Sequence, residues 1–156
     1  MIKTCKCGNV LSDAVIPNKN VYRAYLEEEW QVRKKWYADT SLKTTIRDFW
    51  YCDRCERIYS RVPINNFYYT FIVDDGRGMN GECKCLKNER YTTKFYVLND
   101  DDEDEAWDCV VDKAEEPTFL REFRYCFDCK RVYIKEGDKE RVYKVEDVYP
   151  YKNRRD

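Results

Sequence analysis

Eight of the nine cysteines fall into two copies of one pattern, C-x-C followed about forty residues later by C-x-x-C. The first copy comprises Cys5, Cys7, Cys52 and Cys55, and the second comprises Cys83, Cys85, Cys126 and Cys129. Four thiolates are the ligand set of a closed, tetrahedral, structural zinc site. The pattern therefore predicts two structural Zn²⁺ ions, one in each copy.

Disulfide bonds are the alternative use of paired cysteines. No apolar run in the chain approaches the length of a membrane span, and the first residues lack the apolar stretch of a signal peptide. These features predict a cytoplasmic protein. Thiols stay reduced in the cytoplasm, which favours metal binding over disulfides.

The repeat extends beyond the cysteines. Around each C-x-x-C, six positions are identical at a constant spacing of 74 residues: Phe49/Phe123, Tyr51/Tyr125, Cys52/Cys126, Cys55/Cys129, Arg57/Arg131 and Tyr59/Tyr133. The C-x-C pairs are separated by 78 residues. Such agreement indicates that a whole folding unit was duplicated.

Each copy has a similar order of expected elements. Acidic residues after an aromatic segment, at 27–29 and again at 100–105, suit the first turn of a helix. In the second copy an apolar helix face is expected, comprising Ala106, Trp107, Val110, Val111 and Ala114. The segments after each C-x-x-C are rich in β-branched and aromatic residues, which predicts strands.

The predicted fold class is α+β, with two tandem zinc-ribbon-like units, each a small antiparallel sheet with one inserted helix. We expect the first unit at residues 1–75 and the second at 82–150. Residues 76–81 contain three of the five glycines and are the expected linker. Units of this size bury little core, and a bound metal is one of the usual supplements.

Several kinds of enzyme are disfavoured. The chain has no histidine, which excludes Ser-His-Asp and Cys-His catalytic arrangements. A catalytic zinc keeps a position open for water, whereas four cysteines close the site. Redox chemistry at C-x-x-C is an alternative, but the accompanying C-x-C favours metal binding. The ninth cysteine, Cys109, is expected to be a small buried hydrophobe. We therefore expect no catalytic residues.

The net charge of −1 hides an uneven distribution. Residues 1–80 carry 13 basic and 10 acidic side chains, and residues 81–156 carry 16 and 20. The acidic run could contact a basic protein partner, and its members are Asp100, Asp101, Asp102, Glu103, Asp104 and Glu105. A solvated helix start or a weak Ca²⁺ site are alternatives for the same residues.

Two basic groups suggest a different partner. Arg33-Lys34-Lys35 lies close to Trp30 and Trp36, and the tail contains Lys152, Arg154 and Arg155. Basic and aromatic residues together can bind single-stranded nucleic acid. The same run could also be the solvated face of an amphipathic helix. Nucleic-acid or ribosome binding is therefore the alternative function, and no membrane association is expected.

The N-terminal half resembles a known group of proteins. The resemblance rests on Cys5-Lys6-Cys7-Gly8 followed by Ser12-Asp13, and later on Trp50-Tyr51-Cys52 with Cys55, Arg57, Ile58 and Tyr59. They resemble small, largely uncharacterised bacterial zinc-ribbon proteins with a CxCG…CxxC pattern, some of which are encoded beside secreted toxins and regarded as immunity proteins. The resemblance covers most of residues 1–73, and the second copy departs from it at Leu86, which replaces the glycine. It implies a non-catalytic zinc protein that binds and neutralises a toxin domain.

Overall fold

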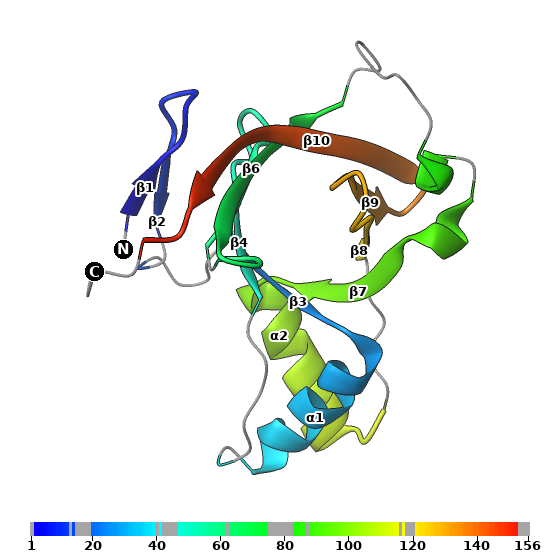
Figure 1. The fold of residues 1–156 in the computed structure, drawn as a ribbon. Coiled ribbons are helices and arrows are strands. Elements are labelled where there is room, and N and C mark those ends of the chain that lie inside the picture. Colours follow the sequence, from blue (N-terminus) through cyan, green and yellow to red (C-terminus); the bar gives the residue numbers. More distant parts are fainter. Residues whose placement is uncertain are drawn as a thin grey trace.

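Figure 1 shows the computed structural model of the chain. It describes residues 2–12, 14, 20–39, 41, 47–61, 63–74, 83–86, 88–115, 117 and 121–152. The predicted linker at 76–81 lies outside these described residues, so the boundary between 1–75 and 82–150 stays a prediction.

Eight antiparallel strands form one closed barrel. They are β3 (Val21–Tyr25), β4 (Asp48–Tyr51), β5 (Ile58–Ser60), β6 (Phe67–Val73), β7 (Thr93–Leu98), β8 (Arg121–Tyr125), β9 (Val132–Glu136) and β10 (Lys139–Pro150). Around the barrel the order is β10, β6, β5, β4, β3, β7, β8 and β9 (Figure 1). The predicted fold of two tandem zinc-ribbon units, each with its own small sheet, is therefore wrong.

The barrel forms because the two repeats cover each other's sheet edges. Each repeat supplies four strands that pair in chain order, β3 to β6 and β7 to β10. A separate four-stranded sheet would expose unpaired backbone groups along both edge strands. Here β3 pairs with β7 and β6 pairs with β10, which closes the sheet. We call these two pairings the seams of the barrel.

The first seam relates the repeats by an approximate two-fold axis. Ala24 pairs with Val97, and these residues are 73 positions apart. The N-cap residues of the two helices, Leu26 and Asn99, are also 73 positions apart. When two equivalent residues of antiparallel strands pair with each other, a two-fold axis passes between them and relates the two strands. The duplication seen in the sequence is therefore also a symmetry of the barrel.

The barrel interior is aromatic. Phe71, Phe95 and Tyr125 are buried in one cluster with Phe49 and Phe123. Phe49 and Phe123 are equivalents in the two repeats, and their ring centroids are 5.6 Å apart. In β8 the buried Phe123 and Tyr125 flank the less buried Arg124, as the side chains of a strand do when one face lines a barrel.

Two helices lie together outside the barrel, next to β3 and β7 (Figure 1). They are α1 (Glu27–Ala38) and α2 (Asp100–Trp107), and α2 continues into the π-helical turn η3 (Asp108–Asp112). Both begin in an acidic segment, as predicted. Trp30, Tyr37 and Leu98 are buried between the helices and the sheet. The expected apolar face of α2 is only partly buried, since Trp107 is 38% and Val111 is 44% exposed.

A small hairpin and two single turns complete the fold. The hairpin is β1 (Ile2–Thr4) with β2 (Val10–Ser12), and it forms a separate two-stranded sheet. The turns are the 3₁₀ elements η1 (Lys84–Leu86) and η2 (Glu89–Tyr91). No helix among the described residues has both the length and the apolar character needed to cross a membrane.

Candidate metal centres

The first cysteine group joins the β1–β2 hairpin to the barrel. Cys5 and Cys7 lie in the loop of the hairpin, and Cys52 and Cys55 lie in the turn between β4 and β5. The Sγ atoms of Cys5 and Cys55 are 3.4 Å apart, and those of Cys7 and Cys52 are 3.6 Å apart. All four sulfur atoms lie within 4.8 Å of one another.

The second group has the same arrangement. The Sγ distance is 3.6 Å between Cys83 and Cys126, and 3.4 Å between Cys85 and Cys129. These four sulfur atoms also lie within 4.8 Å of one another. Cys83 and Cys85 lie at the η1 turn, and the other two lie between β8 and β9.

The two C-x-x-C turns have matching backbones. In the first, the backbone N–H of Glu56 donates to the carbonyl of Cys52 at 2.8 Å, and Glu56 has a φ of 62°. In the second, the N–H of Lys130 donates to the carbonyl of Cys126 at 2.8 Å, also with a φ of 62°. This backbone directs both thiols of each turn to the same point.

The two C-x-C segments, in contrast, take opposite roles. By sequence order Cys5 corresponds to Cys83. In space, Cys5 corresponds to Cys85, because each is the buried thiol that lies 3.4 Å from the second cysteine of its C-x-x-C. The hairpin loop and the η1 turn therefore supply equivalent thiols in opposite chain order. Sequence alignment alone does not reveal this exchange.

A tyrosine contacts the buried thiol in each group. The hydroxyl of Tyr59 lies 3.2 Å from the Sγ of Cys5, and the hydroxyl of Tyr133 lies 3.2 Å from the Sγ of Cys85. Tyr59 also accepts a hydrogen bond from the backbone N–H of Lys6 at 3.1 Å. Groups that hydrogen-bond metal ligands orient them and tune their basicity. These tyrosines are thus positioned to fix the sulfur atoms.

An arginine beside each group contacts the other repeat. Arg57 donates to the Sγ of Cys55 at 3.4 Å and to Glu146 of β10 at 3.0 Å. Arg131 is the equivalent residue and donates to Asp74, which follows β6, at 3.4 Å. The side chain of Asp74 is only 1% exposed. Each cysteine group is therefore linked across the β6–β10 seam to an acidic residue of the opposite repeat.

The thiols of each group differ in acidity. Burial raises the pKa of Cys5, but hydrogen bonds from Tyr59 and from the backbone of Cys7 outweigh it and lower the pKa to about 6. The backbone N–H of Cys85 lowers the pKa of Cys83 to about 7. Burial raises the pKa of Cys55 to about 12. Each group therefore contains a thiol that ionises near neutral pH.

The geometry fits a tetrahedral metal ion. A disulfide has an S–S length of about 2.05 Å, and all eight of these thiols are free. Four sulfur atoms at about 2.3 Å from a central Zn²⁺ would lie about 3.8 Å from one another. The shortest S–S distances of 3.4–3.6 Å and the limit of 4.8 Å bracket that value. Both groups can hold a metal ion, and their four cysteines form a closed ligand set.

Half of the acidic run at 100–105 makes ion pairs within the chain. The pairs are Arg23–Asp100 at 3.4 Å, Arg121–Asp102 at 2.6 Å and Arg33–Glu103 at 2.7 Å. The side chains of Asp101, Asp104 and Glu105 are exposed. Only these three of the six predicted contact residues therefore lie on the surface of α2.

The basic residues of α1 are not all on the surface. Arg33 is 12% exposed, contacts Glu103 and lies 3.8 Å from the centroid of the Trp36 ring. Lys35 and Lys152 are exposed, whereas Arg154 and Arg155 lie outside the described residues. Cys109 is half-buried in η3 and belongs to neither cysteine group.

Sequence reasoning missed the residues that support the sulfur atoms. The identity of Arg57 with Arg131 and of Tyr59 with Tyr133 was a usable signal, since all four recur with the cysteines. Asp74 and Glu146 had no such signal. Their contacts cross the seam, and the seam depends on the closed barrel.

Residues 2–74 match a family described as a domain of unknown function (DUF8617). The matched segment contains β1 to β6 and the first cysteine group. No curated protein matches the chain. No solved structure matches it.

Proposed function

We propose that the chain is a non-catalytic zinc-binding protein in which both zinc ions are structural. The observation that carries the proposal is the pair of closed four-cysteine groups, each with its thiols within 4.8 Å. Each group attaches a peripheral segment to the barrel, and four thiolates leave no ligand position for water. Structural metal sites of this kind contribute directly to folding free energy.

Metal analysis tests this part of the proposal. The protein purified under reducing conditions should contain two zinc ions per chain by mass spectrometry. Cys52→Ser and Cys126→Ser should each lower the content to about one. The matched control is Cys109→Ser, which should retain two. Metal-free folded protein with disulfides, or iron in place of zinc, would contradict the proposal.

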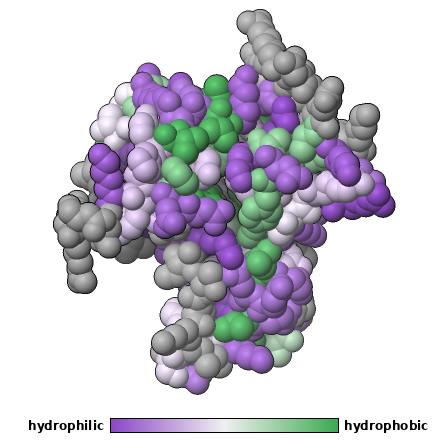
Figure 2. All heavy atoms as spheres, in the orientation of Figure 1, coloured by the Kyte–Doolittle hydropathy of each residue, from purple (hydrophilic) through white to green (hydrophobic). Residues whose placement is uncertain are grey.

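The proposed partner is a protein, most concretely a toxin domain that this chain neutralises as an immunity protein. Two surfaces support a protein partner. Asp101, Asp104 and Glu105 form an exposed acidic face on α2. At the end of β10, Tyr149 and Tyr151 are 54% and 45% exposed, and the ring of Tyr151 contacts Tyr68 of β6. Hydrophobic side chains also gather near the middle of the face in Figure 2. Exposed apolar patches bordered by polar residues are common at protein interfaces.

Binding and rescue experiments test the partner. The product of the adjacent gene should be captured by the zinc-loaded protein, and co-expression should relieve its toxicity. Replacing Asp101, Asp104 and Glu105 with lysine should weaken capture. A control with the same charge change replaces the exposed Asp112, Glu115 and Asp138. Absence of both complex and rescue would refute the immunity function and leave the zinc proposal intact.

Nucleic-acid binding has less support as the alternative. It was predicted from Arg33-Lys34-Lys35 with neighbouring aromatic residues and from the basic tail, but the guanidinium of Arg33 is paired with Glu103. Binding to RNA or DNA that falls with increasing salt would favour this alternative over the toxin partner.

A further inference from the structure

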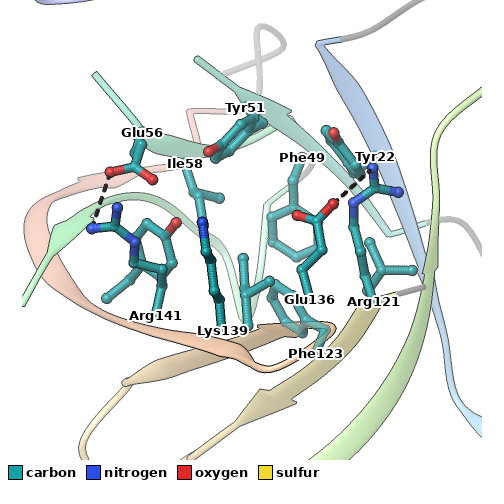
Figure 3. A pocket seen from close by; sticks show the side chains of 13 residues that line it. Tyr22, Phe49, Tyr51, Glu56, Ile58, Arg121, Phe123, Glu136, Lys139 and Arg141 are labelled. Atoms are coloured by element: carbon teal, nitrogen blue, oxygen red, sulfur yellow. Dashed lines mark ion pairs between the residues drawn. The ribbon is translucent and has the colours of Figure 1, made fainter. Parts of the chain in front are cut away.

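One end of the barrel contains a pocket of about 490 Å³ among the described residues (Figure 3). Its deep wall is apolar and includes Phe49, Phe123, Ile58 and Val97. Small-molecule sites in proteins have volumes of about 300–1,000 Å³, with mostly apolar walls and a few polar groups. Well-packed interiors leave few voids larger than a water molecule. This pocket therefore has the size and lining of a ligand site.

Charged groups at the mouth leave one cation unpaired. Glu56 pairs with Arg141 at 3.4 Å, and Glu136 lies 3.8 Å from Arg121, which also pairs with Asp102 at 2.6 Å. Lys139 lies between these two pairs and extends into the pocket (Figure 3). Among the described residues no ion pair neutralises its ammonium group. Within the described part of the chain, the pocket thus combines an apolar interior with a lysine at its entrance that is in no ion pair.

A second pocket lies at the other end of the barrel. Comparing the two pockets shows which features belong to the Lys139 end. The second pocket also has a volume of about 490 Å³ and also contacts Phe49 and Phe123, which therefore separate the two pockets. Its lining includes Phe95, Tyr125 and Val132, the two-fold equivalents of pocket-lining residues in the first pocket. The duplication thus produced one pocket at each end.

Lys139 and Arg141, at the mouth of the first pocket, have no charged equivalents in the first repeat. Tyr143 pairs with Val132 of β9 as Phe71 pairs with Ile58 of β5, so β10 and β6 correspond at a spacing of 72 residues. At this spacing the equivalents of Lys139 and Arg141 are Phe67 and Tyr69. The barrel closes without charge at those positions in the first repeat. Barrel formation therefore does not require the cations at the mouth of the first pocket.

We propose that the pocket at the Lys139 end binds an amphipathic monocarboxylate, a small molecule with an apolar or aromatic body and one carboxylate. The body packs against Phe49 and Phe123, and the carboxylate pairs with the ammonium of Lys139. Arg141 is paired with Glu56, and Arg121 is paired with Asp102 and Glu136, so Lys139 is the cation among the described pocket-lining residues that a ligand carboxylate can pair with. The ligand contacts neither the cysteine thiols nor the exposed acidic residues of α2.

Fluorescence titration of the zinc-loaded full chain with 8-anilinonaphthalene-1-sulfonate tests the site. This probe has an aromatic body and one negative charge, and its emission should rise on binding. Lys139→Met should weaken binding at least about tenfold, the loss expected for one charge-assisted contact. Lys135→Met is the matched control, because Lys135 is exposed on β9 and does not line the pocket. Circular dichroism and zinc content confirm that each variant is folded.

Competition separates the role of charge from that of apolar contact. Decanoate should displace the probe at a concentration at least about tenfold lower than decanol does, and Lys139→Met should abolish this difference. Ile134→Trp fills the proposed pocket and should prevent probe binding, whereas Ile64→Trp fills the opposite pocket and should leave probe binding unchanged. Equal potency of decanoate and decanol, loss of binding only in Ile64→Trp, or no probe binding would each overturn the proposal.

Discussion

The residues that contact a ligand sulfur determine how firmly a thiolate site holds its metal. Tyr59 and Arg57 each contact a thiol of the first group, and Tyr133 contacts one in the second. None of them is a ligand itself. They restrict the sulfur positions and offset the negative charge that four thiolates place around a divalent ion.

Tyr59→Phe should reduce zinc affinity at the first site by about 10- to 100-fold, because the hydrogen bond to the Cys5 sulfur is lost while the ring remains. Competition with a chromogenic chelator measures this affinity. The exposed Tyr149 provides the control, and Tyr149→Phe should have no effect. Unchanged affinity in Tyr59→Phe would show that the hydroxyl does not support the metal ligand.

Glu103 has a structural role that the sequence did not indicate. Its carboxylate pairs with Arg33 at 2.7 Å and accepts a hydrogen bond from Tyr25 at 2.9 Å. The side chains of Arg33 and Glu103 are 12% and 11% exposed. Burial and the negative charge of Glu103 raise the pKa of Tyr37 and Tyr25 above the usual tyrosine value, so both hydroxyls stay protonated.

Glu103→Gln should lower the free energy of unfolding by about 3 kcal/mol, because the guanidinium of Arg33 would remain buried without a counter-charge. Urea denaturation of the zinc-loaded protein measures the change. Asp104→Asn, one position along the same helix and exposed, should change it by less than about 0.5 kcal/mol. Similar effects from the two substitutions would contradict a buried ion pair between the helices.

At the scale of elements, the two C-x-x-C turns were the most predictable part of the chain. A short local sequence determines their backbone, and both have the same positive φ at the residue after the second cysteine. The helices were also predictable at their starts, where Glu29 and Asp102 accept hydrogen bonds from the N-cap backbone. The strands were expected, but the pairings β3–β7 and β6–β10 between the repeats were not, because these pairings join residues far apart in the chain.

Zinc affinity at the first cysteine group should fall as the pH is lowered. A bound thiol must lose its proton. The pKa of Cys55 is raised by burial to about 12, so it must release a proton at neutral pH. The pKa of Cys5 is about 6, so below that pH a further proton must be displaced. A chelator competition series from pH 5 to 8 should show a steeper loss of affinity below pH 6. Equal affinity across the series would contradict these assignments.

The metal-free protein should show the corresponding change in stability. The folded-state pKa of Cys5 is below its ordinary value of 9.0, so its thiolate stabilises the fold above pH 9. That contribution is lost as the pH falls from about 9 through about 6. The raised pKa of Cys55 acts in the opposite direction, and its contribution is lost as the pH rises from 9 towards 12. Urea midpoints of metal-free protein should therefore rise from pH 6 to pH 9.

At the scale of the whole molecule, the two repeats share one sheet. The seams β3–β7 and β6–β10 provide backbone hydrogen bonds that neither repeat can make alone. The ion pairs Arg57–Glu146 and Arg131–Asp74 reinforce the second seam and connect it to both cysteine groups. Loss of one metal is therefore expected to weaken the entire barrel.

A fragment of residues 1–80 should form no folded monomer, because β3 and β6 would both be exposed edge strands. Co-expression with a fragment of residues 81–156 should restore a one-to-one complex with two zinc ions. Size-exclusion chromatography and circular dichroism distinguish these states. A monomeric 1–80 fragment with native secondary structure would show instead that each repeat is an independent domain.

The cysteine spacing was sufficient to predict which eight thiols form two groups, because metal-ligand chemistry restricts the number and kind of ligands. The duplication, the helix starts and the C-x-x-C turns also followed from local patterns. The closed barrel, the exchanged roles of Cys5 and Cys85 and the pocket beside Lys139 did not. These features depend on which sheet edges pair and on which side chains then face one interior. Both are settled by contacts between residues 70 to 83 positions apart, which no local pattern encodes.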